Sequence, residues 1–348
     1  MEAETDGPEQ AASRRPTSGN CSLKELGLSP SLIGDRPYYV HHGDCITHMN
    51  TMFPGCIDFA VMSVPFPAVY AYTDQACDIG NSEELRTEAK IHFGFFFKQL
   101  ARVLKPGRVA AIHIQQIPRM KRTGEVGLHD FRGLLSRIGE RAGLVYEYDW
   151  LIRKNPQAQA IRTRSRELQF AGLEADRSKT RGTLGDYILK FRAPGENAVP
   201  INAKGQVSRN DWIKWAEACW DDIQETDTLN TAAAKSEDDL RHICPLQLEV
   251  IRRLILLYSN PGEIVFSPFA GIGSEGYVAL GGKSPKTGKR IDDPRRFYGC
   301  EIKPEYHAQA LVNLARAEKQ AADEEQFTLF GAIDDEHAAA INADCDAE

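Results

Sequence analysis

The stretch SPFAGIGSEG, residues 267–276, decides the fold of this chain. It follows the apolar run EIVFS (263–267), which predicts a buried strand, and its glycines fit the pattern G-x-G-x-x-G. Glycine lets a backbone turn sharply and approach a ligand closely. The run RFYGCEI (296–302) predicts the next strand, and Glu301 near its end could accept both hydroxyls of a ribose. This order predicts a nucleoside-binding turn, with a turn that binds no ligand as the alternative.

The position of this turn predicts the arrangement of the sheet. Only one more strand and a helix from 304 to about 318 precede the tail, whereas a nicotinamide-binding Rossmann unit needs several further strands. The missing strands must therefore come from the N-terminal side, and the remaining elements alternate between strand and helix. Strands are predicted at 38–41, 57–64, 109–114 and 145–153, and helices from near Cys45 and at 83–104, 131–142 and 245–258. We expect an α/β fold whose mostly parallel sheet is assembled in permuted order.

Composition places the chain among soluble proteins. Its 348 residues carry 42% hydrophobic side chains and a net charge of −7, which suits one large or two modest domains. No run approaches the ~18–20 apolar residues of a membrane span, and MEAETDGPEQ at the N-terminus lacks a signal peptide's apolar stretch, so we expect a cytoplasmic protein. The eight cysteines form no C-x-x-C pair, which disfavours zinc and disulfide frameworks and predicts buried, reduced thiols.

Charge is distributed unevenly along the chain. Residues 102–192 hold 19 Lys and Arg against 9 Asp and Glu, whereas residues 321–348 hold nine acidic residues and no basic ones. A basic middle predicts contact with nucleic acid, for which Arg162, Arg164 and Arg166 are candidates. A merely well-charged, solvated surface is the alternative. The alternation of strands and helices also fails between about 154 and 240, apart from a strand at 187–192 and a helix candidate at 211–220, which predicts an insertion or a small second domain.

A second motif closes the strand predicted at 57–64. Ser63-Val64-Pro65-Phe66 lies at the carboxyl edge of the sheet, where open α/β folds place their active sites. A hydroxyl, a carbonyl followed by a proline and an aromatic face could hold a flat ring that bears an amino group. In isolation the motif is better explained as a proline-rich loop with a hydrophobic plug.

Taken together, the motifs resemble those of the amino-directed DNA methyltransferases of the permuted β type, which modify cytosine at N4 or adenine at N6. SVPF at 63–66 resembles the family's catalytic [DNS]-P-P-[YFW], and SPFAGIGS at 267–274 resembles its cofactor motif D-P-F-x-G-x-G-T. Further family segments are matched, in family order, by HGDC at 42–45, RHICPLQLEVIRRLI at 241–255 and YGCEIKPEY at 298–306.

The resemblance implies a Rossmann-like, S-adenosylmethionine-dependent methyltransferase sheet in permuted order, with an inserted small target-recognition region. It divides the chain into a disordered N-terminus (1–22), a catalytic half (23–154), the target-recognition insertion (155–210), a cofactor-binding half (211–320) and an acidic tail (321–348). Catalysis is assigned to Ser63, Val64, Pro65 and Phe66. The cofactor is assigned to Asp44, His242, Pro245, Ser267, Pro268, Phe269, Gly271, Gly273, Ser274 and Glu301. No metal is implied.

Three positions depart from the family pattern. Val64 replaces the first proline of the catalytic motif, which makes that loop less rigid. Ser267 replaces the usual Asp of the cofactor strand and removes an acceptor near the methionine end of the ligand, and Cys244 stands where a proline is typical.

The implied reaction is methyl transfer from S-adenosylmethionine to the amino group of a base flipped out of double-stranded DNA. Ser63 Oγ and the Val64 carbonyl would accept the two amino hydrogens while Phe66 stacks on the base. Ser63 favours cytosine N4, because S-P-P motifs resemble those of the cytosine-directed members, and adenine N6 is the alternative. The same residues are also compatible with a nicotinamide-dependent dehydrogenase that uses the glycine turn, with a catalytically inactive DNA-binding relative and with an RNA methyltransferase.

The acidic tail contains the pentapeptide Gln326-Phe327-Thr328-Leu329-Phe330. It resembles the Q-L-x-L-F motif with which bacterial replication proteins dock on the sliding clamp. Two aromatic side chains in a solvated segment predict burial, either against the clamp or against the protein's own sheet.

Overall fold

The computed structural model describes residues 36–345, apart from 68–72, 83–84, 86, 120–126, 164–172, 181 and 231–244. Side chains are not described at 160–163, 179 and 325–345. The N-terminus predicted as disordered (1–22) therefore lies outside the described residues. No described helix is long and apolar enough to cross a membrane.

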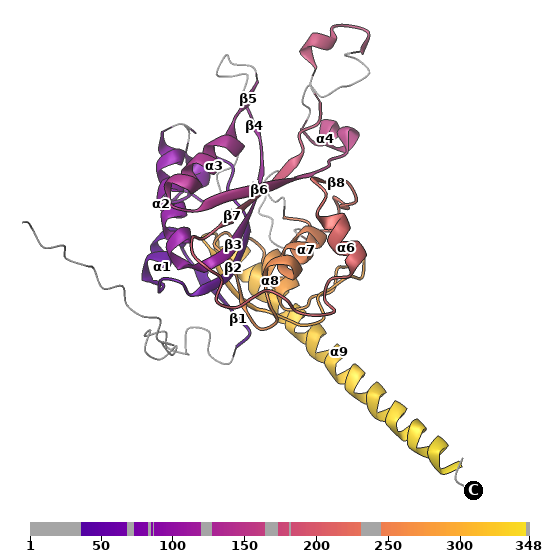
Figure 1. Cartoon of the computed structure of the whole chain (residues 1–348). Coiled ribbons are helices and arrows are strands. Elements are labelled where there is room, and N and C mark those ends of the chain that lie inside the picture. Colours follow the sequence, from indigo (N-terminus) through magenta and orange to yellow (C-terminus); the bar gives the residue numbers. More distant parts are fainter. Residues whose placement is uncertain are drawn as a thin grey trace, which may run out of the picture.

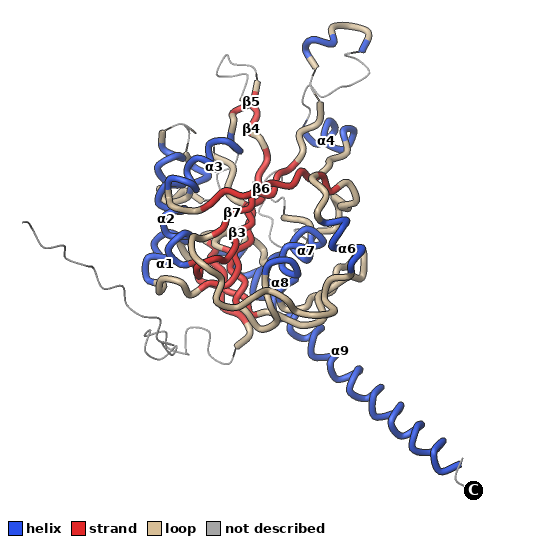
Figure 2. Tube along the Cα trace, in the orientation of Figure 1, coloured by secondary structure: helices blue, strands red, loops and turns tan. Residues whose placement is uncertain are grey.

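In this part of the chain, eight strands form one central sheet with helices on both faces (Figures 1 and 2). The strands are β1 (Tyr38–His42), β2 (Ile57–Ser63), β3 (Leu104–Gln115), β6 (Val145–Ile152), β7 (Asp186–Arg192), β8 (Cys219–Trp220), β9 (Ile264–Ser267) and β10 (Arg296–Glu301). The helices are α1 (Cys45–Thr51), α2 (Glu88–Val103), α3 (Phe131–Arg141), α4 (Pro156–Thr163), α6 (Arg209–Trp215), α7 (Leu248–Tyr258), α8 (Ser274–Ala279) and α9 (Pro304–Cys345). Smaller elements are the 3-10 helices η2 (Ile79–Asn81) and η4 (Arg177–Lys179) and a hairpin of β4 (Ile117–Pro118) and β5 (Leu128–His129).

The sheet is mostly parallel and assembled in permuted order, as the sequence predicts. Its strand order is β1-β10-β9-β2-β3-β7-β6-β8, so β9 and β10, from the C-terminal part of the chain, lie between β1 and β2. All neighbouring pairs are parallel except those that involve β7. This order brings the ends of β2 and β9 together at one edge, which places the catalytic and cofactor motifs beside each other.

Alternation along β2 explains why helices cover both faces of the sheet. Phe59 and Val61 contribute to one core cluster, which includes side chains of α7 and α8, whereas Ala60 and Met62 contribute to the other, which includes side chains of α1, α2 and α3. All four side chains are fully buried. A central parallel strand must be apolar on both faces, and this is why the run IDFAVM predicts such a strand correctly.

The range predicted as the insertion, 155–210, includes one strand of the central sheet. Strand β7 falls within that range, but it pairs along its length with β3 and β6 and therefore belongs to the central sheet. Its apolar residues Ile188, Leu189 and Phe191 are fully buried because helices cover both faces here too. Before β7, the described residues of this range, 155–163, 173–180 and 182–185, lie outside the sheet.

Two further elements differ from the predictions. The helix predicted at 211–220 ends at Trp215, and Cys219 and Trp220 form the short strand β8 beside β6. Helix α9 continues far beyond the predicted end near 318 and projects from the body of the molecule (Figure 1).

Candidate active site

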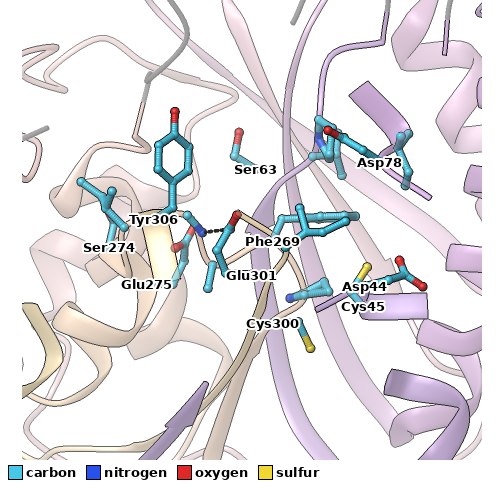
Figure 3. A pocket seen from close by; sticks show the side chains of 18 of the residues that line it. Asp44, Cys45, Ser63, Asp78, Phe269, Ser274, Glu275, Cys300, Glu301 and Tyr306 are labelled. Atoms are coloured by element: carbon cyan, nitrogen blue, oxygen red, sulfur yellow. Dashed lines mark hydrogen bonds between the residues drawn. The ribbon is translucent and has the colours of Figure 1, made fainter. Parts of the chain in front are cut away.

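A cleft of about 1030 Å³ lies at the carboxyl ends of β1, β2, β9 and β10 (Figure 3). Residues 63–66, which follow the apolar part of β2, line it together with residues 268–272, which follow β9. Phe66 and Gly271 therefore share one cavity, although they are far apart in the chain. This convergence is the main geometric requirement of a reaction between a ligand on the glycine turn and a ring held by Phe66.

The glycine turn is fixed by the carboxylate of Glu301. The Gly271 backbone N–H donates to Glu301 Oε2 at 2.7 Å, and the Lys303 N–H donates to Oε1 at 2.9 Å. Burial raises the pKa of Glu301 to about 7, although these backbone hydrogen bonds favour the ionised form. Gly271 has a φ of 54° and faces open space, so the backbone itself is accessible to a ligand at this point.

Two predicted cofactor residues support the turn from behind and do not line the cleft. Gly273 has a φ of 82°, and a Cβ at this position would lie 3.2 Å from the backbone of Ala310 in α9. The positive φ and the close approach of α9 both favour glycine there. Ser267, which stands where the family has Asp, is fully buried at the end of β9.

Acidic side chains gather in the cleft. Asp44, Asp78, Glu275 and Glu301 line it, and its described lining residues include no Lys or Arg. Asp78 also caps the 3-10 helix η2, where its side chain accepts from the Gly80 N–H at 2.9 Å. Such a lining attracts a cation and repels the two negative charges of a pyrophosphate. The cleft therefore fits S-adenosylmethionine, which carries a sulfonium and an ammonium group, better than a nicotinamide dinucleotide.

Glu275 was not predicted as a site residue, and its burial has a consequence for stability. It is 3% exposed in the first turn of α8, and burial raises its pKa to about 8. The ordinary pKa of a glutamate is 4.5. Between pH 4.5 and about pH 8, Glu275 therefore keeps its proton in the folded state but has released it in the unfolded state. Stability is therefore lost as the pH rises through this window.

We expect Glu275→Gln to be more stable than the unaltered protein at pH 8.5, by on the order of 3 kcal/mol, and similar to it at pH 5. Urea unfolding of the ligand-free protein at both pH values measures the difference. Glu305→Gln is the matched control, because Glu305 is exposed on α9. Equal stabilities of Glu275→Gln and the unaltered protein at pH 8.5 would contradict the prediction.

The predicted catalytic motif at 63–66 is held in place by its neighbours, although Val64 replaces the family's first proline. The Val64 side chain is 1% exposed in the core, and the Val64 N–H donates to the carbonyl oxygen of His113 at 3.3 Å. Phe66 is half-buried beside the ring of Phe131, with ring centroids 6.2 Å apart. Ser63 lies 2.8 Å from Nδ1 of His113, measured from its Oγ atom. Side-chain packing and a strand hydrogen bond thus restrict the loop in which we predicted lower rigidity.

The remaining predicted residues divide into three groups. Asp44, Pro245, Pro268, Phe269 and Ser274 line the cleft. Three others, His242, Arg164 and Arg166, lie outside the described residues. Arg162 belongs to α4, and the pentapeptide at 326–330 belongs to α9, but their side chains are not described, so DNA contact and clamp docking stay predictions.

Part of the basic charge counted in residues 102–192 is neutralised inside the fold. Acidic partners within ion-pair distance are Asp149 for Arg132, Asp186 for Lys154, Glu147 for Lys190 and Arg192, and Glu263 for Arg108. Because Glu263 is the one partner in this list that lies outside residues 102–192, these pairs leave fewer unpaired basic side chains for DNA but hardly change the net positive charge of the segment.

The cysteine predictions are met in part. Cys45 and Cys300 are buried beside the cleft, whereas Cys77, which also lines it, is exposed. Among the described residues, no group of His, Cys, Asp and Glu could hold a metal ion.

Comparison with known proteins agrees with this geometry. The sequence profile of a DNA methylase family, the N6 and N4 methyltransferases, matches residues 57–312. DNA adenine methyltransferase YhdJ of Escherichia coli is 39% identical over 75 residues, which are 22% of each chain. The chain therefore matches about a fifth of that relative's length.

Two solved structures resemble the fold. One is a candidate DNA modification methylase from Thermus thermophilus in complex with S-adenosyl-L-methionine, with a TM-score of 0.58 and 19% identity over 80% of this chain and 94% of that one. The other is the cytosine-N4-specific PvuII DNA methyltransferase, with a TM-score of 0.54 and 17% identity over 82% and 90%. At these identities the likeness concerns the fold.

The matched range includes both motifs of the cleft, residues 63–66 and 267–274. Because the matching family is one of DNA methylases, the match favours a methyltransferase over a dehydrogenase. The dehydrogenase is set aside, and the prediction of S-adenosylmethionine as the cofactor is confirmed. Because the match extends from β2 into α9 and covers most of the chain, this protein belongs to the family of N6 and N4 DNA methylases.

Proposed function

We propose that the protein transfers a methyl group from S-adenosylmethionine to the exocyclic amino group of a base flipped out of double-stranded DNA, and that the base is cytosine, modified at N4. The observation that supports this proposal is the single cleft shared by Ser63, Phe66, Gly271 and Glu301. The choice of cytosine rests on Ser63, because the S-P-P form of the motif resembles the cytosine-directed members of the family.

The cofactor end of the cleft consists of the glycine turn and the acidic side chains. Glu301 is placed to accept the ribose hydroxyls, and Asp44 adds negative charge around the position of a cationic ligand. When bound, S-adenosylmethionine supplies an electrophilic methyl group on a positively charged sulfur. The carboxylates in turn favour the positively charged ligand over its neutral product, which would assist product release.

The residues proposed to hold the target base, Ser63 to Phe66, would make its amino group more reactive. The lone pair of an exocyclic amino nitrogen is delocalised into the ring and is a poor nucleophile. Ser63 Oγ and the Val64 carbonyl would each accept one amino hydrogen and favour a pyramidal nitrogen whose lone pair is free. The Val64 carbonyl is followed by Pro65, which has no N–H, and Phe66 offers its face to the base.

Access to a base in a duplex requires base flipping, which costs a few kcal/mol. We propose that segment 155–185, which includes Arg162, Arg164 and Arg166, contacts the DNA on either side of the target base. The segment ends before β7 because that strand is part of the central sheet. Phosphate contacts from these arginines would position the duplex, and contacts with base edges would select the sequence. Docking of residues 326–330 on a sliding clamp would be a separate partner interaction.

Nucleoside mass spectrometry of DNA incubated with the protein and S-adenosylmethionine tests this function. We expect N4-methylcytosine, and N6-methyladenine would reassign the base. Methylated nucleosides in RNA but not in DNA would identify an RNA methyltransferase. Binding of both ligands with no methylated product would identify an inactive relative.

A further inference from the structure

A row of buried polar side chains lies behind Ser63. The Oγ atom of Ser63 lies 2.8 Å from Nδ1 of His113, and Nε2 of the same ring lies 3.0 Å from Oδ2 of Asp186. Ser63 and His113 are register partners on β2 and β3, and Asp186 is the first residue of β7, paired with Gln115 of β3. Three adjacent strand ends thus place a hydroxyl, an imidazole and a carboxylate in line from the cleft into the protein.

The carboxylate of this row is ionised and fully engaged. Lys154 Nζ lies 2.6 Å from Oδ2 of Asp186, and the Gln115 amide donates to Oδ1 at 3.0 Å. His113, Lys154 and Asp186 are 7%, 7% and 5% exposed. Burial alone would raise the pKa of Asp186, but His113 and Lys154 outweigh it and hold that pKa below its ordinary value. Among the described residues, the charged groups that face His113 are Asp186, directly, and Lys154, through Asp186.

The partners of the ring define its tautomer. A carboxylate only accepts hydrogen bonds, so an uncharged ring, which has a single N–H, best places that hydrogen on Nε2, 3.0 Å from Asp186 Oδ2. Nδ1 is then an acceptor, and it receives the hydroxyl hydrogen of Ser63. The hydrogen of Ser63 points away from the cleft, and the lone pairs of Oγ remain for a hydrogen-bond donor in the cleft.

We propose that His113, Asp186 and Lys154 are positioning residues that fix Ser63 as a hydrogen-bond acceptor and give the proton released by amino methylation a path away from nitrogen. This inference rests on the proposed function, because it concerns the same target amino group. It adds three residues that carry no family motif, and it explains why a serine, whose hydroxyl could otherwise donate as well as accept, suffices at this position.

The proton balance follows from the product. An –NH2 group becomes –NH–CH3. The nitrogen lone pair forms the N–C bond as the methyl–sulfur bond breaks and leaves its electron pair on sulfur, and the electron pair of the broken N–H bond stays on nitrogen. The released proton passes to Ser63 Oγ while the hydroxyl proton of Ser63 passes to Nδ1 of His113. The resulting imidazolium faces the Asp186 carboxylate, which stabilises it. The proton returns by the same path, through Ser63, to water in the cleft after the product has left.

Two variants separate orientation from proton acceptance. His113→Asn keeps an amide oxygen that can accept the Ser63 hydroxyl hydrogen but cannot take up a proton, whereas His113→Leu loses both properties. We expect single-turnover methyl transfer to DNA to slow at least tenfold in His113→Asn and at least 100-fold in His113→Leu, within the usual range of general acid–base effects. The affinity for S-adenosylmethionine should change less than twofold in both, since His113 does not line the cleft.

The pH–rate profile distinguishes this role from a merely structural one. The pH dependence of single-turnover methyl transfer should differ between the unaltered enzyme and His113→Asn, because the amide cannot take up the proton that Ser63 passes on. Lys154→Met removes a partner of Asp186 and should also slow methyl transfer. His92→Asn on α2 is the control and should follow the unaltered enzyme. His113→Leu with an unaltered rate, or His113→Asn with the same pH profile as the unaltered enzyme, would overturn the proposal.

Nitrogen-15 NMR of the imidazole rings in the ligand-free protein provides a readout that does not depend on turnover. The His113 signals, identified by their loss in His113→Asn, should show a protonated Nε2 and a hydrogen-bonded, unprotonated Nδ1 at pH 8, and the Nδ1 shift should move in Ser63→Ala. A ring protonated on Nδ1 at pH 8 would overturn the proposal. If the unaltered protein methylates no DNA, the proposed function and the proton step fail together, and the NMR result still decides the orientation of Ser63.

Discussion

Phe66→Ala is expected to lower kcat/KM for DNA methylation about 100-fold while the affinity for S-adenosylmethionine changes less than twofold. Stacking of a base on an aromatic side chain contributes about 1–3 kcal/mol, and a base that is held less firmly spends less time in line with the methyl group. The Glu301 carboxylate accepts from the N–H groups of Gly271 and Lys303, and Phe66 packs beside Phe131, so the loss of the Phe66 ring should leave the cofactor contacts of Glu301 in place. Transfer of a radiolabelled methyl group to DNA and calorimetric titration of the cofactor measure the two effects.

Controls separate stacking from general packing. Phe66 touches Phe131, so the thermal unfolding of the variant must be compared with that of the unaltered protein. Phe95→Ala on α2 removes an aromatic side chain that is 57% exposed and should leave kcat/KM unchanged. Phe66→Trp, which keeps an aromatic face, should retain most of the activity. An unaltered kcat/KM in Phe66→Ala would refute the assignment of Phe66 to the target base.

The sheet and the two motifs could be predicted from the sequence because their signals are local. A buried parallel strand such as β2 is a continuous apolar run, and the turn after β9 needs glycine where its φ is positive, as at Gly271. Strand ends of a parallel sheet meet at one edge, so the convergence of the two motifs followed from the predicted topology. Elements whose position depends on contacts with distant parts of the chain are harder to predict from the sequence. The strand β7 was predicted at almost its observed bounds, but nothing local indicates that it pairs with β3 and β6.

Further site residues depend on burial and neighbours that the sequence does not encode locally. Glu275 looks like an ordinary acidic residue in the first turn of a helix, and only the packed turn shows that it is buried. Asp78 follows no predicted element. His113 lies in the predicted strand at 109–114, where a lone histidine has no signature, and its partner Asp186 comes from a strand that was placed in the insertion. The sequence shows that Val64 replaces a proline of the family motif. It does not show that burial of the Val64 side chain in the core restricts the loop instead.

Glu301→Gln is expected to weaken the binding of S-adenosylmethionine about 100-fold at pH 8. The carboxylate accepts the N–H groups of Gly271 and Lys303 with different oxygens, and an amide has only one acceptor oxygen, so one of these donors is left unpaired. A hydrogen bond to a charged group contributes about 1.5–3 kcal/mol, and the loss of one such bond together with the negative charge near a cationic ligand approaches 3 kcal/mol, or about 100-fold. Calorimetric titration of the cofactor measures the change, and Glu305→Gln should bind like the unaltered protein.

The pH dependence of the same titration tests why Glu301 matters. Because its pKa is about 7 in the ligand-free protein, Glu301 is mostly protonated at pH 6 and mostly ionised at pH 8. A cationic ligand favours the ionised form, so the affinity of the unaltered protein should rise by about tenfold between these pH values, with release of a proton on binding. Glu301→Gln should lose this part of the slope, and any slope that remains should disappear when Glu275, whose pKa is about 8, is also replaced by Gln. An affinity that stays constant or falls from pH 6 to pH 8 would show that the negative charge of these carboxylates does not stabilise the bound ligand. Glu301 would then act only by holding the glycine turn through the Gly271 N–H.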